Sequence, residues 1–82
     1  MFDKSAFNAA IEKRGVKITA LARAMGISPS TIYKKNERNG DYTVPEIIAF
    51  CEFLNVTPQE RDRIFFASEV SQTQQWNSSE LS

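Results

Sequence analysis

Apolar residues near the start of the chain recur every three or four positions, which is the spacing of one face of an α-helix. The first stripe predicts a helix capped by Asp3 and ended by Gly15. The second predicts a helix from about Lys17 to Met25, with Gly26 as its stop signal. The apolar positions of the two stripes are Phe7, Ala10 and Ile11, then Ile18, Leu21, Ala22 and Met25.

A new helix signal follows almost at once. Ser28 can cap a helix with its hydroxyl, and Pro29 then occupies the first helical position, where its missing N–H is not needed. We expect this helix to end at about Glu37 and to be anchored by Ile32. Because so few residues separate the stop signal from the new cap, the third helix must turn sharply away from the second. This is the geometry of a helix-turn-helix.

A fourth helix is predicted after the Asn39-Gly40-Asp41 loop, where Thr43 and Glu46 form a capping box. Its spacing indicates a core stripe and, away from that stripe, a second apolar edge that contains Phe50 and Phe53. The stripe consists of Val44, Ile47, Ile48, Cys51 and Leu54.

A fifth helix should begin at Thr57, since Pro58 and Glu60 repeat the capping pattern. Residues 64–70 fit a helix end or a short strand equally well. Residues 71–82 are polar apart from Trp76 and Leu81 and are expected to form a flexible polar tail. The chain is therefore predicted to be all-α, with a five-helix domain over residues 1–70.

Composition narrows the function classes. The chain has 82 residues, one cysteine and no histidine, which excludes an internal disulfide, the usual zinc sites and histidine-based catalysis. Its acidic residues lie at predicted helix ends and polar faces. We therefore expect no enzymatic activity, no metal and no cofactor, and we interpret Cys51 as part of the core.

The formal net charge is zero, but the charges are unevenly distributed. Residues 1–42 hold eight Lys or Arg and four acids, a net charge of +4, whereas residues 43–82 hold two and six, a net charge of −4. The basic half contains the helix-turn-helix. The chain shows no secretory signal and no long apolar run, so a cytoplasmic protein without a membrane span is expected.

Residues 17–56 resemble the Cro and phage-repressor type of helix-turn-helix domain, also called the XRE type. The resemblance rests on segments that occur in the family's register: Leu21-Ala22, Met25-Gly26-Ile27, Ser28-x-Ser30-Thr31-Ile32 and Leu54-Asn55-Val56. The length and the IFFASEV segment are similar to small Cro-like phage proteins. The resemblance implies a repressor-type fold, a double-stranded DNA operator as partner and, in a phage setting, a bacterial host cell.

The resemblance also implies roles for the third helix and its surroundings. Positions expected to contact bases in the major groove are Pro29, Ser30, Thr31, Tyr33 and Lys34. Positions expected to contact phosphates are Lys17, Ser28, Lys35, Arg38, Asn39 and Tyr42. Among the base readers Ser30 and Lys34 are the best candidates, because they lie one turn apart on one helix face.

Three residues depart from the family pattern. Ile18 replaces a common glutamine, Lys17 replaces a Ser or Thr cap, and Lys35 replaces an apolar anchor late in the third helix. These departures leave two functions open. The first is a sequence-specific DNA-binding transcriptional regulator, a repressor that occupies its operator. The alternative is a protein-interaction modulator that binds a repressor or another regulator instead of DNA.

An apolar patch further predicts a homodimer. Its members, which could equally form a surface for another partner, are Phe50, Phe53, Phe65 and Phe66. The predicted core consists of Phe7, Ile11, Leu21, Met25, Ile27, Ile32, Ile47, Ile48, Cys51 and Leu54.

Overall fold

The computed structural model describes residues 2–67 of the 82-residue chain. The predictions for the polar tail, for Trp76 and for residues 68–70 lie outside the described residues. Five α-helices account for most of the described part, and no strand is found within it. The helices are α1 (Lys4–Arg14), α2 (Ile18–Met25), α3 (Pro29–Glu37), α4 (Val44–Leu54) and α5 (Pro58–Phe65).

The helix boundaries follow from local capping chemistry, as the sequence predicts. Asp3, Ser28, Thr43 and Thr57 each accept a hydrogen bond from the backbone N–H three residues later, over 3.0 to 3.3 Å. Between α2 and α3, Gly26 adopts the left-handed conformation with φ of 72° and ends α2. The predicted all-α fold with five helices is confirmed.

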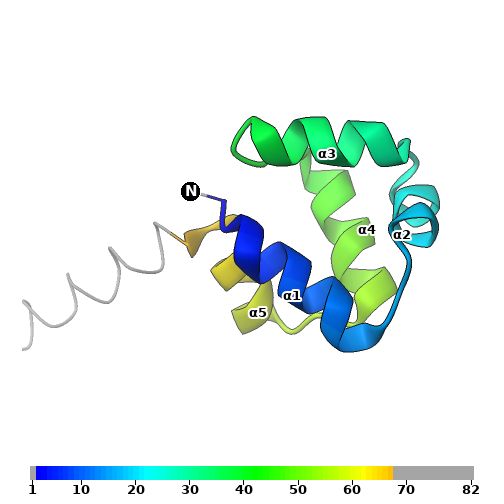
Figure 1. Ribbon diagram of the computed structural model, residues 1–82. Helices are drawn as coiled ribbons and strands as arrows, with labels where there is room; N and C mark the ends of the chain where they lie inside the picture. Colours follow the sequence, from blue (N-terminus) through cyan, green and yellow to red (C-terminus); the bar gives the residue numbers. More distant parts are fainter. Residues whose placement is uncertain (1, 68–82) are drawn as a thin grey trace, which may run out of the picture.

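The helices are arranged so that α3 lies along one edge of the molecule (Figure 1). The α4 helix runs from beneath α3 toward the opposite end, and it packs mainly against α2. The α1 and α5 helices pack against each other below α3, and the start of α1 reaches the end of α3, where Lys4 pairs with Glu37. This arrangement leaves the outer side of α3 uncovered by any other described helix.

An aromatic cluster forms the centre of the core. The ring of Phe7 stacks on Phe50 at 4.9 Å and on Tyr42 at 5.8 Å between centroids, and Phe65 meets Phe50 edge-on at 5.2 Å. Phe2 completes the cluster. Of the predicted core, the residues confirmed as buried are Phe7, Leu21, Met25, Ile32 and Leu54, and those packed partly buried against them are Ile11, Ile27, Ile47 and Cys51.

The predicted core stripe of α4 is wrong at two of its five positions. Phe50 is completely buried, whereas Val44 and Ile48 of the expected core stripe are 69% and 51% exposed. The helix is turned toward Phe50 because Phe7 and Phe65 offer that side chain a large aromatic contact.

The predicted patch of four phenylalanines does not exist as a surface. Phe50 and Phe65 belong to the core, Phe66 is partly buried, and only Phe53, at 42%, is among the exposed large apolar residues.

Arg14 joins three helices at the far end of the molecule. Its guanidinium donates to the carbonyls of Ala10 and Leu54 and makes two hydrogen bonds, of 2.8 and 3.2 Å, to the Glu60 carboxylate. These bonds tie the end of α1 to the end of α4 and the start of α5.

None of the described helices has the length and apolar character that a membrane crossing requires.

Candidate nucleic-acid interface

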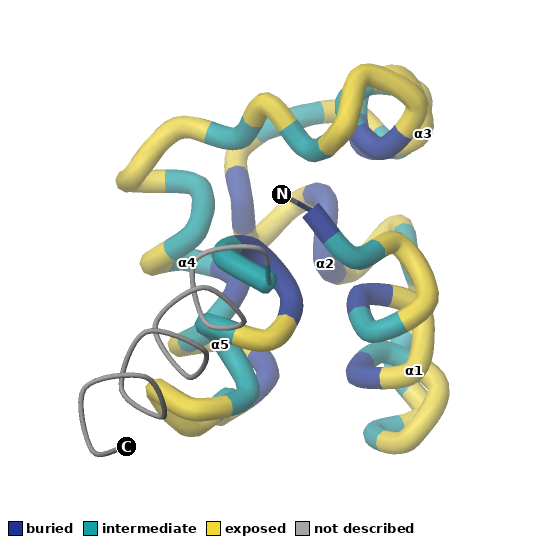
Figure 2. The backbone as a smooth tube through the Cα atoms, turned by 90° about the vertical axis from the view of Figure 1, so that its left-hand side faces the viewer, coloured by how far each residue is buried: buried dark blue, intermediate teal, exposed yellow. Residues whose placement is uncertain are grey.

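The outer face of α3 is an accessible polar surface of the helix-turn-helix. Figure 2 shows α3 nearly end-on at the upper right, with its buried residues on the side toward the other helices. Ile32 and Asn36 point into the protein. Residues on the opposite side of the same helix therefore face solvent.

The outer face brings together three of the predicted base readers. Ser30 and Lys34 are exposed, and Tyr33 is 58% exposed. Within the described residues, the Lys34 ammonium forms no ion pair and no hydrogen bond. This face thus offers a hydroxyl, a phenol and a free cation within two turns of helix.

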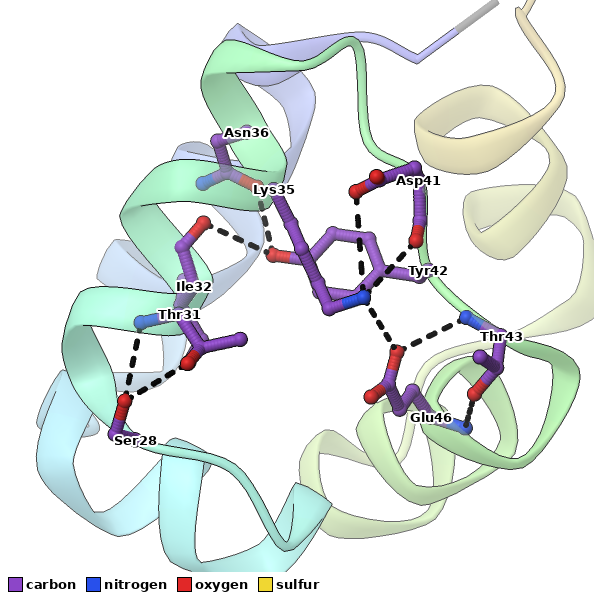
Figure 3. Close-up of polar contacts among 9 residues, drawn as sticks. All are labelled: Ser28, Thr31, Ile32, Lys35, Asn36, Asp41, Tyr42, Thr43 and Glu46. Carbon is purple, nitrogen blue, oxygen red and sulfur yellow. Dashed lines mark hydrogen bonds and ion pairs between the residues drawn. The ribbon is translucent and has the colours of Figure 1, made fainter.

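The two remaining predicted base readers, Pro29 and Thr31, are partly buried at the start of α3. Ser28 Oγ accepts from the Thr31 N–H at 3.2 Å and lies 2.8 Å from the Thr31 hydroxyl, as Figure 3 shows. The Ser28 and Thr31 hydroxyls are therefore occupied by the helix cap. Ser28 nevertheless remains exposed beside the first turn of α3.

Three of the predicted phosphate contacts are accessible to solvent. Lys17, Arg38 and Asn39 are exposed. Lys17 stands at the N-cap of α2 without a side-chain capping bond, so the first N–H groups of that helix carry no side-chain cap. Exposed cations and helix N–H groups are the usual donors to phosphate oxygens.

Lys35 differs from its neighbour Lys34, because its side chain turns into the protein and is only 19% exposed. The ammonium donates to the Asp41 carbonyl at 3.0 Å and lies 3.4 Å from Glu46 Oε1 and 5.6 Å above the Tyr42 ring (Figure 3). Its donors point at these partners and not at solvent. The predicted phosphate role of Lys35 is therefore not supported by its position.

Glu46 is the main anionic partner of Lys35. Burial raises the pKa of the Glu46 carboxyl, but the hydrogen bond from the Thr43 N–H and the charge of Lys35 outweigh that effect and hold it below its ordinary value of 4.5. The carboxylate therefore stays ionised at neutral pH beside the ammonium.

Tyr42 is likewise part of the protein interior. Its hydroxyl donates to Asn36 Oδ1 at 2.7 Å, and its ring stacks on Phe7. Burial, with the charges of Glu46 and Asp41, raises the pKa of the phenol, which stays protonated at neutral pH. The predicted phosphate contact of Tyr42 is not supported by its position, because its hydroxyl already donates to Asn36.

Sequence reasoning missed Glu37. This residue lies seven positions after Ser30, so it extends the same outer face by one further turn. It is strongly exposed, and its carboxylate pairs with the Lys4 ammonium at 3.1 Å. The helical spacing alone could have identified it. A carboxylate at this position repels DNA phosphates, but it can accept a hydrogen bond from the amino group at cytosine N4.

Together these features define a helix-turn-helix domain, formed by α2 and α3, in which α3 presents an uncovered polar face. Comparison with protein families matches residues 8–60 to the Cro/C1-type HTH DNA-binding domain. The match covers more than half of the chain, and the chain belongs to this family. Searches of curated proteins and of solved structures find no match. The family resemblance predicted from the sequence is thus confirmed, and with it a DNA-binding helix-turn-helix domain.

Proposed function

We propose that this protein is a sequence-specific transcriptional repressor of the phage Cro or repressor type. It binds an operator as a homodimer, in the cytoplasm of a bacterial host cell, and blocks access by occupying the DNA. This mode of action involves no catalytic step and no cofactor. The single observation that carries the proposal is the outer face of α3, where Ser30, Tyr33 and Lys34 are exposed and uncovered.

The chemistry of this face suits the major groove. A lysine favours guanine O6 and N7, and a hydroxyl pairs with several base edges. Lys34 and Ser30 are one turn apart, so both reach neighbouring base pairs in one groove. Lys17 and Arg38 are exposed cations, and we assign them to phosphate contacts beside the reading face.

A gel shift tests the proposal with the DNA that flanks the protein's own gene, against random DNA of equal length. We expect a clear preference for one flanking fragment. Lys34→Ala should cost about 1–3 kcal/mol on that fragment and relax the base choice at one position. Lys17→Ala is the matched control, which should weaken all sequences alike and reduce the salt slope by about one unit.

The absence of any preference at low salt would reject the repressor function. The alternative is then a protein-interaction modulator whose partner is a repressor or another regulator. Two observations favour that alternative: Val44 and Ile48 expose apolar surface on α4, and Glu37 places a negative charge on the outer face of α3. A pull-down with the candidate repressor would then replace the DNA titration.

A further inference from the structure

Lys35 makes several of the contacts that fasten the loop between α3 and α4, residues 38–43, to α3. Its backbone carbonyl accepts hydrogen bonds from the N–H groups of Arg38 at 3.1 Å and Gly40 at 2.7 Å. Its side chain reaches forward and donates to the Asp41 carbonyl at 3.0 Å. The same residue therefore holds the loop at its beginning and at its middle.

The Lys35 ammonium also joins the loop to α4. Glu46 Oε1 lies 3.4 Å from the ammonium and accepts the Thr43 N–H at 2.9 Å, so one carboxylate oxygen serves the lysine and the α4 cap. The Tyr42 ring lies beneath the cation. Figure 3 shows these side chains converging on one point between α3, the loop and α4.

The loop carries two of the groups proposed to contact phosphate, Arg38 and Asn39. Its backbone is unusual at Asn39, a residue other than glycine with φ of 65°. Left-handed residues of this kind persist where surrounding contacts fix them. The direction in which Arg38 and Asn39 face therefore depends on the contacts that close the loop.

We propose that Lys35 is a positioning residue, whose ammonium fixes the loop between α3 and α4 and so sets where Arg38 and Asn39 meet the DNA backbone. It acts through these two residues and touches no phosphate itself. The proposal rests on the proposed DNA-binding function for its effect on DNA, but the effect on the loop is independent of it.

The first experiment uses the free protein. Lys35→Met keeps the apolar stem and removes the ammonium. In two-dimensional NMR we expect shifted amide signals for Gly40, Asp41 and Thr43, while signals of α5 stay in place. Unchanged loop signals in this variant would overturn the proposal. A melting curve confirms that the variant is folded at the temperature used.

The second experiment measures affinity and salt slope on the preferred fragment for Lys35→Met, Arg38→Ala and the double variant. If Lys35 positions Arg38, each single change lowers the slope by about one unit and the double variant lowers it no further. If Lys35 contacts a phosphate directly, the double variant loses about two units, and the proposal is overturned. Lys17→Met combined with Arg38→Ala is the control, because Lys17 is proposed to contact a phosphate by itself, and this double variant should lose about two units.

The Glu46→Gln variant gives a second way to distinguish a positioning role of Lys35 from a direct phosphate contact. The amide oxygen still accepts from Thr43, but the lysine loses its nearer anionic partner and keeps only the Asp41 carboxylate, 4.0 Å away, together with its own charge. A positioning role predicts weaker DNA binding, whereas a phosphate contact predicts unchanged or tighter binding, which would overturn the proposal. If the wild-type protein prefers no fragment, the proposed function fails, and the NMR experiment alone upholds or overturns the role of Lys35 in the loop.

Discussion

At the scale of single residues, the hydrogen bond between Tyr42 and Asn36 illustrates how burial determines the contribution of a polar group to the free energy of unfolding. Asn36 is the one buried polar side chain in the described part, at 8% exposure, and the Tyr42 hydroxyl donates to its Oδ1 at 2.7 Å. Tyr42→Phe removes this donor and leaves the amide oxygen buried without it. We expect a loss of about 1–3 kcal/mol in the free energy of unfolding, measured by denaturant titration.

The chain offers a matched control for this change. Tyr33 is 58% exposed, so Tyr33→Phe removes a hydroxyl that already contacts water. Its effect on unfolding should stay within about 0.5 kcal/mol. Equal losses for the two variants would show that the Tyr42 hydroxyl contributes nothing specific to stability.

The sequence predicts residue roles well where the cause is local and poorly where the partner is distant. Ser28 could be recognised as a cap because the N–H it serves lies three residues away. Lys34 and Lys35 look alike in the sequence, and their difference depends on Glu46, which is eleven residues further on. Tyr42 was assigned to a phosphate for the same reason, since its partners become visible only after folding.

At the scale of elements, the α3–α4 loop depends on Gly40. This glycine has φ of 70°, and a Cβ at this position would collide with the Phe2 side chain. Gly26 has a similar φ of 72° but open space around it. Gly26→Ala should therefore cost about 1–2 kcal/mol through backbone strain alone.

Gly40→Ala should cost that amount and about 1–3 kcal/mol more, because Phe2 must leave its place in the aromatic cluster. Thermal and denaturant unfolding of the two variants give the comparison. Since the backbone strain is nearly the same in both, the difference isolates the contact with Phe2. A Gly40→Ala loss no larger than that of Gly26→Ala would mean that Phe2 moves aside at little cost.

The contact that joins α1 to α5 predicts a pH dependence. The hydrogen bonds from Arg14 hold the pKa of the Glu60 carboxyl below its ordinary value of 4.5. The unfolded chain then binds the proton more readily, so the contact stabilises the fold above that value and is lost as the pH falls through the lowered pKa. We expect the free energy of unfolding to fall between about pH 5 and pH 3.

Glu60→Gln tests this assignment. The variant should be less stable than the wild type at pH 7 by about 1 kcal/mol and should show a shallower fall below about pH 5. Glu52→Gln, at an exposed position of α4, is the control and should retain the wild-type fall. If the free energy of unfolding depends on pH identically in Glu60→Gln and the wild type, Glu60 does not contribute to the loss of stability in acid.

At the scale of the whole molecule, the helix count and the helix-turn-helix followed from the sequence because they are set by caps and turns. The rotation of α4 did not follow, because its apolar residues occur on several sides of the helix. Packing against Phe7 and Phe65, which are distant in sequence, decides which side is buried. The patch of phenylalanines proposed for self-association was therefore misplaced, although the expectation of a dimer is left untested.

The apolar surface that α4 leaves exposed is the place where we now expect the second copy. Val44 and Ile48 are one helical turn apart and form a ridge that no described element covers. If this dimer binds an operator, its two α3 helices should contact half-sites whose centres lie about 10–10.5 base pairs apart. Ile48→Glu puts a charge into the interface and should convert the dimer to a monomer, with little change in folding because the residue is 51% exposed.

Sedimentation at roughly tens of micromolar measures the association, and Asn8→Glu on the exposed side of α1 controls for the added charge. On DNA, Ile48→Glu should weaken binding to a fragment with two half-sites much more than binding to a single half-site, because only the former gains from the linked second domain. A wild-type protein that sediments as a monomer throughout this range would reject the dimer. A dimer that survives Ile48→Glu would instead place its interface elsewhere, because a glutamate buried in a paired apolar ridge is too costly to leave association intact.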